Sequence, residues 1–295
     1  MRAQITAAAL ALVVLAANSA HAREPLVLQP AADWQVKQGD NRCILDRTFG
    51  KGEQTVQLEL RMIAPVDKFD LLAVGKPLRV YSAKRKWLRY RFDHDADETH
   101  PFAFWGMSGG LPALRFSASL KKDQKLAKLL AESSPDADDP GPDLPREAAV
   151  NRLVLSGAFN QDVDLELGSM RPPLDMARAC FDKLMSDWGI DVAAQKTLTR
   201  RASPKGRPED WLSSKDYPET MLRQGRGGQV DFRLIVDAEG KPASCKILSS
   251  YSPEDFAEVV CNSLMANAEF DPALDAQGKP VASYFIDTVT FVIPG

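Results

Sequence analysis

Histidine, excess basic charge and long apolar runs are all scarce in this sequence. Only three histidines occur among 295 residues, so few side chains could build a histidine-based metal or acid/base site, and we predict neither a metal nor a cofactor. The 37 basic residues are outnumbered by 40 acidic ones, which gives a formal net charge of −3. Proteins that bind nucleic acid normally present basic charge to the phosphates, so we expect no nucleic-acid partner. After residue 22, no apolar run approaches the roughly 18 residues that a membrane-spanning helix needs.

The amino terminus is typical of a cleaved signal peptide, residues 1–22. Arg2 supplies a positive charge, residues 5–17 form an apolar run, and Ala20-His21-Ala22 has the small–x–small form that signal peptidase accepts. An uncleaved membrane anchor is the alternative. At about 1.5 Å per residue, however, the run reaches only about 20 Å across a hydrocarbon core of roughly 30 Å. We therefore predict export to the periplasm, with Arg23 as the first mature residue.

The four cysteines are Cys43, Cys180, Cys245 and Cys261. In an exported chain they favour two disulfides over free thiols. Four cysteines allow three pairings, and the sequence alone does not choose among them. One bridge within each of two domains would pair Cys43 with Cys180 and Cys245 with Cys261, and we predict this arrangement.

Residues 23–190 read as a sheet-rich domain. Residues 56–62 alternate apolar and polar side chains, and residues 87–92, 114–120, 152–155 and 163–167 have similar patterns. A helix is predicted after Pro172-Pro173, with Gly189 as its natural end. Residues 121–133 show helical spacing, and residues 134–147 form an acidic, proline-rich loop. Residues 191–210 collect basic side chains with proline and glycine, so we predict a basic, exposed linker there.

Residues 211–295 have a sharper pattern of elements. Tyr217-Pro218 opens a short helix, residues 228–236 form an amphipathic strand, and residues 243–249 return as its hairpin partner. A helix follows Ser252-Pro253-Glu254-Asp255, which provides an N-cap, a proline and two acids. Residues 281–293 form a third strand. The predicted fold class is therefore α+β, with a sheet-rich first domain and a small three-stranded antiparallel sheet with two helices at the end.

This last region resembles the C-terminal domain of TonB-type energy transducers. The matching motifs, in order, are Tyr217-Pro218, Gly228 with its alternating apolar residues, residues 237–240, Ser249-Ser250, Phe270-Asp271-Pro272-Ala273, Gly278-Lys279-Pro280-Val281 and Val289-Thr290-Phe291. The resemblance implies an edge strand that takes up an extended peptide from a partner. A folded sheet-rich domain stands where the transducers of this family have a long proline-rich spacer.

From this resemblance we expect a non-enzymatic periplasmic protein. Its C-terminal module would bind an extended segment of an envelope protein, such as an outer-membrane transporter or receptor, by strand addition linked to transmembrane transport. A second copy of the chain, paired through the sheet edge, is an alternative partner. The predicted partner-binding residues are Tyr217, Pro218, Tyr284, Ile286, Thr288 and Thr290.

The alternative function is a periplasmic hydrolase in residues 23–190, with the C-terminal module as an anchor. Residues 106–110 fit the G-x-S-x-G pattern around Ser108, but no histidine follows His100, and the triad order of that fold requires one. We interpret this motif as a glycine-rich turn.

Two further motifs have plain interpretations. Asp136, Asp138, Gly141 and Glu147 fit positions of a calcium loop, but Pro140 stands at a ligand position, so we predict an acidic loop without calcium. The aromatic residues of residues 87–105 could form a sugar- or peptide-binding face, but alternating aromatics in strands are usually core, which we predict. They are Trp87, Tyr90, Phe92, Phe102, Phe104 and Trp105.

Overall fold

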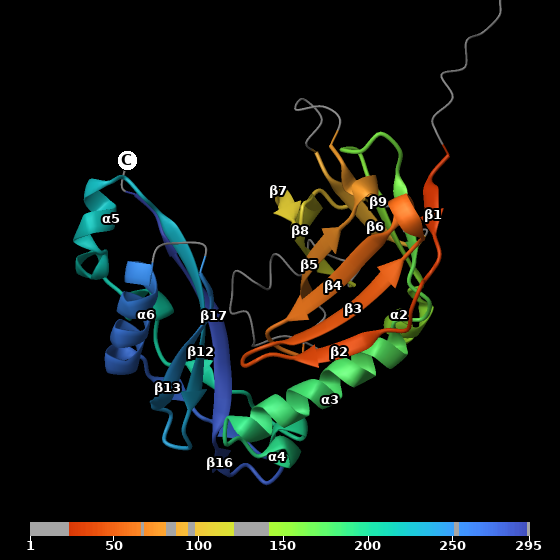
Figure 1. Cartoon of the computed structure of the whole chain (residues 1–295). Coiled ribbons are helices and arrows are strands. Elements are labelled where there is room, and N and C mark those ends of the chain that lie inside the picture. The colour runs from red at the N-terminus through yellow and green to blue at the C-terminus, as the bar shows by residue number, and fades with distance from the viewer. Residues whose placement is uncertain are drawn as a thin grey trace, which may run out of the picture.

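The computed structural model describes residues 24–65, 68–80, 87–93, 98–120, 142–250 and 254–293. The predicted signal peptide, the predicted helix at residues 121–133 and most of the acidic loop lie outside these residues. The elements form two groups, each around its own hydrophobic core. Figure 1 shows the N-terminal group on the right and the C-terminal group on the left, with one long helix that runs below the N-terminal group toward the lower end of the C-terminal group. Within the described ranges, no helix has the length and apolar character needed to cross a membrane.

A six-stranded antiparallel sheet is the larger layer of the N-terminal group, in the order β2-β3-β4-β5-β8-β7. In β4, Val56–Met62, buried residues alternate with more exposed ones, as the sequence pattern predicts. The other strands are β2 Gln35–Gln38, β3 Cys43–Phe49, β5 Lys68–Val74, β7 Ala103–Ser108 and β8 Leu111–Ser119.

A second, four-stranded sheet shares this core, in the order β1-β10-β9-β6. Its first strand runs parallel to β10, and the other pairs are antiparallel. Its strands are β1 Leu26–Leu28, β6 Arg89–Phe92, β9 Arg152–Ser156 and β10 Val163–Glu166. The sheet-rich first domain of the predicted α+β fold is thus confirmed.

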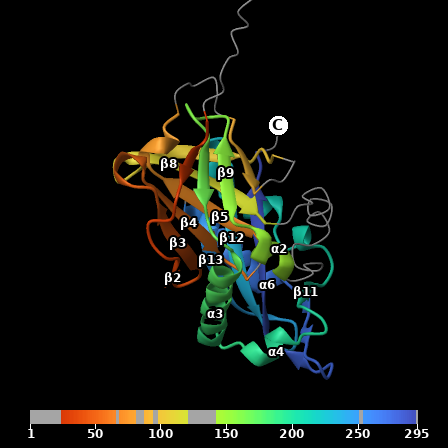
Figure 2. The same ribbon diagram turned by 90° about the vertical axis from the view of Figure 1, so that its right-hand side faces the viewer.

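The long helix α3, Arg171–Asp187, lies along β2 and β3 (Figures 1 and 2). Its buried face includes Phe181 and Leu184, and Cys180 forms a disulfide with Cys43 of β3. Gly189, with a φ of 78°, supplies the left-handed residue that ends it. The short helix α2, Leu144–Ala149, packs beside α3.

The C-terminal group is a three-stranded antiparallel sheet in the order β13-β12-β17. Helix α6 packs on one face of this sheet and is joined to β13 by the Cys245–Cys261 disulfide. Both disulfides therefore have the predicted pairing. The main elements are α5 Glu219–Arg223, β12 Gly228–Val236, β13 Pro242–Ser250, α6 Glu254–Asn267 and β17 Ser283–Phe291. Three short strands complete the group: β14 Phe270–Asp271, β15 Ala273–Leu274 and β16 Pro280–Val281.

Residues 191–210, the predicted linker, contain three regular elements, of which the last is a short 3-10 helix, Pro208–Asp210. Helix α4, Val192–Lys196, follows α3, and β11, Ser203–Pro204, pairs with β14. Ala202 is buried in the C-terminal core. Part of this segment is therefore packed against the C-terminal group, whereas the position of the domain boundary stays a prediction.

The core prediction for the aromatic residues is only partly right. Tyr90 and Phe92 are buried, but Trp87, Phe102 and Phe104 are 76%, 81% and 49% exposed. The reason is position: β7 is the last strand of its sheet, Phe104 projects from its outer face, and Trp87 and Phe102 lie just outside strands.

Candidate partner-binding edge

Strand β17 lies at one edge of the C-terminal sheet. Within the described residues it pairs only with β12, in a register that runs without a shift from Val236 opposite Ser283 to Gly228 opposite Phe291. An edge strand of nine residues leaves every second backbone N–H and C=O without a strand partner. The geometry therefore offers a long, regular edge for one more strand.

The two faces of β17 have different environments. Phe285 is fully buried, with its ring 5.0 Å from that of Phe270, and Phe291 lies 4.5 Å from Phe256 of α6. Tyr284, Ile286, Thr288 and Thr290 alternate with these residues and belong to the opposite face, where Thr288 and Thr290 are exposed. Their role in binding a partner stays a prediction.

Two hydrogen bonds show which backbone groups point out of the sheet. The Thr288 N–H donates to Asp287 Oδ1 (2.7 Å), and the Ala282 carbonyl accepts from Gln195 Nε2 (3.1 Å). Neither group is therefore used by β12. Along an antiparallel strand, the N–H and C=O groups of successive residues point alternately to one neighbour strand and to the other. The backbone groups of Ile286 and Thr290 therefore point outward as well. The predicted partner-binding residues of β17 are thus those whose peptide groups face the open edge.

The opposite edge strand, β13, is less regular. Its pairing with β12 shifts register between Asp231 and Phe232 and again between Ile235 and Val236. The carbonyl of its bulged residue Leu248 accepts a hydrogen bond of 2.5 Å from Arg42 Nη2 in the N-terminal group. Bulges and covered backbone groups are the means by which proteins prevent strand addition at an edge. The open edge of this sheet is therefore β17.

Asp287 is the one acidic residue of β17. It is half-buried on the face that carries Phe285 and Val289. Burial raises its pKa, and the nearby Asp231 carboxylate raises the pKa further, while the hydrogen bond from the Thr288 N–H opposes this shift. The Thr288 hydroxyl also donates to Asp231 Oδ1 (2.7 Å). A polar group of two carboxylates and one threonine thus occupies the middle of the edge.

Tyr217 and Pro218 lie where β17 ends. The Tyr217 ring packs 5.6 Å from Phe256 and 5.4 Å from Phe291, and its hydroxyl donates to the Arg226 carbonyl (2.7 Å). Pro218 is the N-cap residue of α5. Tyr217 therefore helps to hold the end of β17 against α6.

Sequence reasoning missed Trp188 and Gln195, which approach β17 from α3 and α4. The Trp188 ring lies 6.1 Å from that of Tyr284, and the Arg233 guanidinium of β12 lies 3.5 Å from the Trp188 ring centre. Burial lowers the pKa of Arg233 to about 10. No local motif marks these residues, because their contacts depend on how the two groups pack together.

The other candidate sites have little geometry to support them. Ser108 ends β7, and Gly109 and Gly110, with φ values of 56° and 78°, form the two-residue turn into β8. The glycine-rich turn is confirmed, and no helix follows the serine. Glu147, which fits the last position of the calcium-loop pattern, is fully buried and accepts two hydrogen bonds from Arg178. The residues that the structure describes contain no cluster of metal-ligating side chains.

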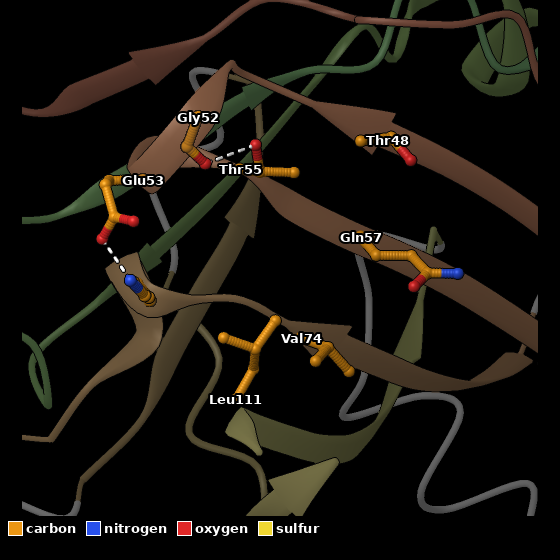
Figure 3. A pocket seen from close by; sticks show the side chains of 8 residues that line it. Thr48, Gly52, Glu53, Thr55, Gln57, Val74 and Leu111 are labelled. Carbon is orange, nitrogen blue, oxygen red and sulfur yellow. Dashed lines mark hydrogen bonds and ion pairs between the residues drawn. The ribbon is translucent and has the colours of Figure 1, made fainter. Parts of the chain in front are cut away.

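One shallow hollow lies on the outer face of the six-stranded sheet (Figure 3). Its volume is about 190 Å³, which is below the size of typical small-molecule sites. Lys76 and Glu53 form an ion pair at its rim, so the only charges there neutralise each other. The remaining lining residues are Thr48, Gly52, Thr55, Gln57, Val74 and Leu111.

Comparison with known families identifies the C-terminal group. Residues 213–293 match the family model of the Gram-negative bacterial TonB protein C-terminal. This family is a non-enzymatic protein-interaction module of the cell envelope, whose domains bind envelope proteins such as outer-membrane receptors. The comparison with curated proteins gives no match. The resemblance seen in the sequence is therefore confirmed for this part of the chain.

Proposed function

We propose that this protein is a non-enzymatic periplasmic member of the TonB family that captures an extended segment of another envelope protein. The segment adds as a fourth strand beside β17, and an outer-membrane transporter is the partner class that the family favours. The activity is linked to transmembrane transport, and a cleaved signal peptide, residues 1–22, brings the chain to the periplasm.

The observation that carries this proposal is the contrast between the two edges of one sheet. β13 has two register shifts and a backbone carbonyl occupied by Arg42, whereas β17 has an unbroken register. No lysine, arginine or proline occurs in residues 283–291 to discourage pairing. A regular edge strand whose residues Tyr284, Ile286, Thr288 and Thr290 carry no charge and turn their backbone groups outward is the feature that strand addition uses.

A proline at Thr288 tests the proposal. The Thr288 N–H points outward, so Thr288→Pro removes a donor from the open edge and leaves the pairing with β12 intact. Thr288→Val is the matched control, because it also removes the hydroxyl bond to Asp231 but keeps the N–H. Each variant would carry a photoreactive side chain at Thr290, and crosslinking would be done in intact cells.

We expect Thr288→Val to retain the crosslinked partner and Thr288→Pro to lose it, with both variants folded by circular dichroism. Unchanged capture by Thr288→Pro would contradict strand addition at β17. An adduct between two copies of the chain would replace the envelope partner with a homodimer. Esterase or peptidase activity that Ser108→Ala abolishes would instead support the hydrolase.

A further inference from the structure

The start of β17 is covered by helix α4 of the same chain. The Gln195 side chain donates to the Ala282 carbonyl (3.1 Å) and accepts from the Ser283 hydroxyl (2.9 Å). Ser283 is 3% exposed. The Ala282 carbonyl is one of the outward backbone groups of the edge, so Gln195 occupies the position that a partner strand would need there.

Trp188, at the end of α3, packs on the face of the sheet that carries the Tyr284 side chain, beside this covered end of the edge. Its ring packs edge-on against Tyr284, and Arg233 lies over it at 3.5 Å. Arg233 is 7% exposed, and its Nε and Nη1 atoms have no hydrogen-bond partner within the described chain. A buried guanidinium without such partners depends on the aromatic ring for its stabilisation. Arg233 therefore holds Trp188 against the outward face of the sheet.

These covering helices are firmly anchored. The Cys43–Cys180 disulfide ties α3 to the six-stranded sheet, and Lys196 of α4 pairs with Asp182 of α3 (2.5 Å). Asp191 caps α4 with hydrogen bonds of 2.9 and 3.1 Å from two backbone N–H groups. Figure 1 shows α4 at the lower end of β17, far from the end near α5. At that far end, Thr288 and Thr290 are exposed.

We propose that α3 and α4 form a stop at the start of the partner edge, which confines an added strand to residues 286–291 and sets its register. This inference rests on the proposed strand addition and names the part of the edge that it uses. The partner is then a short extended segment of an envelope protein whose pairing must end before Tyr284. Gln195 occupies an outward backbone group, and Trp188 covers the adjoining side-chain face. Both therefore act as positioning residues for this limit without forming the part that binds.

A crosslinking scan along the edge tests the position of the stop. A photoreactive phenylalanine analogue would replace Tyr284, Ile286, Thr288 or Thr290, one at a time, in the full-length protein in cells. We expect the same adduct from 288 and 290, and about tenfold less from 284, because an added strand that ends before Tyr284 places no residue beside a reporter there. In the double variant Trp188→Ala with Gln195→Ala, capture should extend to 284.

Amide hydrogen exchange supplies a measurement that needs no partner. In the double variant the inward amide of Ser283, at the start of β17, should exchange about tenfold faster, because the start of the strand loses the contacts that fix it, whereas the inward amide of Val289 should stay protected and so report an intact sheet. Trp87→Ala, which removes an exposed tryptophan, is the matched control and should change neither region.

The two measurements distinguish the stop from strand addition itself. Equal capture from 284 and 290 in the unmodified protein would overturn the stop and leave strand addition standing. Unchanged exchange of the Ser283 amide in the double variant would also overturn it. Absence of any adduct at all four positions would contradict the proposed function, and the exchange result would then decide whether α3 and α4 close this end of the edge.

Discussion

Glu147 and Arg178 form a paired ion bridge in which one partner is fully buried and the other is not. Two hydrogen bonds of 2.9 Å join the guanidinium to the two carboxylate oxygens, and Glu147 is 0% exposed. Arg178 also pairs with Asp175 on the surface of α3. The bridge therefore fixes α2 against α3, and the loss of Arg178 and the loss of Glu147 should cost different amounts of stability.

Arg178→Ala should destabilise the protein more than Glu147→Ala. The first change leaves a buried carboxylate without its main partner, which costs about 3–5 kcal/mol, whereas the second leaves an arginine that still pairs with Asp175. Urea unfolding of the two variants measures the difference. Arg171→Ala serves as the control, since Arg171 lies 4.0 Å from Glu147 and should cost less than about 1 kcal/mol. Equal costs for Arg178→Ala and Glu147→Ala would contradict this account.

Removal of each disulfide should affect its own core. The Cys245–Cys261 bridge closes a short loop, with a sequence separation of 16, and the Cys43–Cys180 bridge a long one of 137. The chain-entropy relation gives losses of about 3 and about 5 kcal/mol for the paired serine variants. Because the two cores are separate, hydrogen exchange should accelerate mainly in the C-terminal group when Cys245 and Cys261 are replaced. Equal acceleration in both groups would show that the cores unfold as one.

Neutralising Asp287 should stabilise the C-terminal group at neutral pH. Burial raises its folded pKa, so the folded state binds this proton more tightly than the unfolded chain, and the ionised carboxylate destabilises the fold at pH 7. This cost falls as the pH falls through the folded pKa and vanishes below the ordinary aspartate value of about 3.9. Asp287→Asn keeps an oxygen for the Thr288 N–H, so only the charge is removed.

Unfolding curves of Asp287→Asn and the unmodified protein, compared between pH 7 and pH 3, measure this effect. The stability gain should be largest at pH 7 and should disappear at the acid end. Glu239→Gln, which removes a carboxylate from an exposed turn residue, controls for the change in net charge. A gain that persists at pH 3 would assign the effect to packing rather than to ionisation.

Trp188 and Arg233 should be energetically coupled. A double-mutant cycle with Trp188→Ala and Arg233→Met isolates the contact, and we expect a coupling of about 0.5–2 kcal/mol, the range of cation–π pairs. Methionine retains much of the length of arginine without its charge, so the cycle reports mainly on the guanidinium. A coupling near zero would mean that Arg233 does not hold Trp188 in place.

The elements of the fold were largely readable from the sequence. Residues 56–62 alternate strictly, and the strand they form has the same bounds. The proline pair lies in the first turn of α3, and Gly189 lies just after its end, because local backbone preferences and hydrophobic period act within a few residues. Such local signals also identified the C-terminal family, whose short motifs occur in a fixed order.

Position in a sheet, by contrast, is not a local property. Phe102 and Phe104 have the apolar side chains of core residues, but Phe104 lies on the last strand of a sheet and Phe102 just before it, and only the strand order shows this. The same limit applies to the candidate site. The outward face of β17 followed from alternation, whereas the covering contacts of Trp188 and Gln195 join residues about 90 positions apart and depend on tertiary packing.

The hydrogen bond from the Thr288 amide to the Asp287 carboxylate has a consequence for solubility. A regular sheet edge without lysine or proline invites copies of the same chain to stack strand on strand into open-ended polymers. Here a side chain of the strand itself turns back and occupies one outward amide at the centre of the edge. A stacking copy must first displace this carboxylate and then approach its negative charge with an identical aspartate of its own. A segment that brings a lysine or arginine to the same place meets attraction instead, so the strand discriminates against itself in favour of a different, basic sequence.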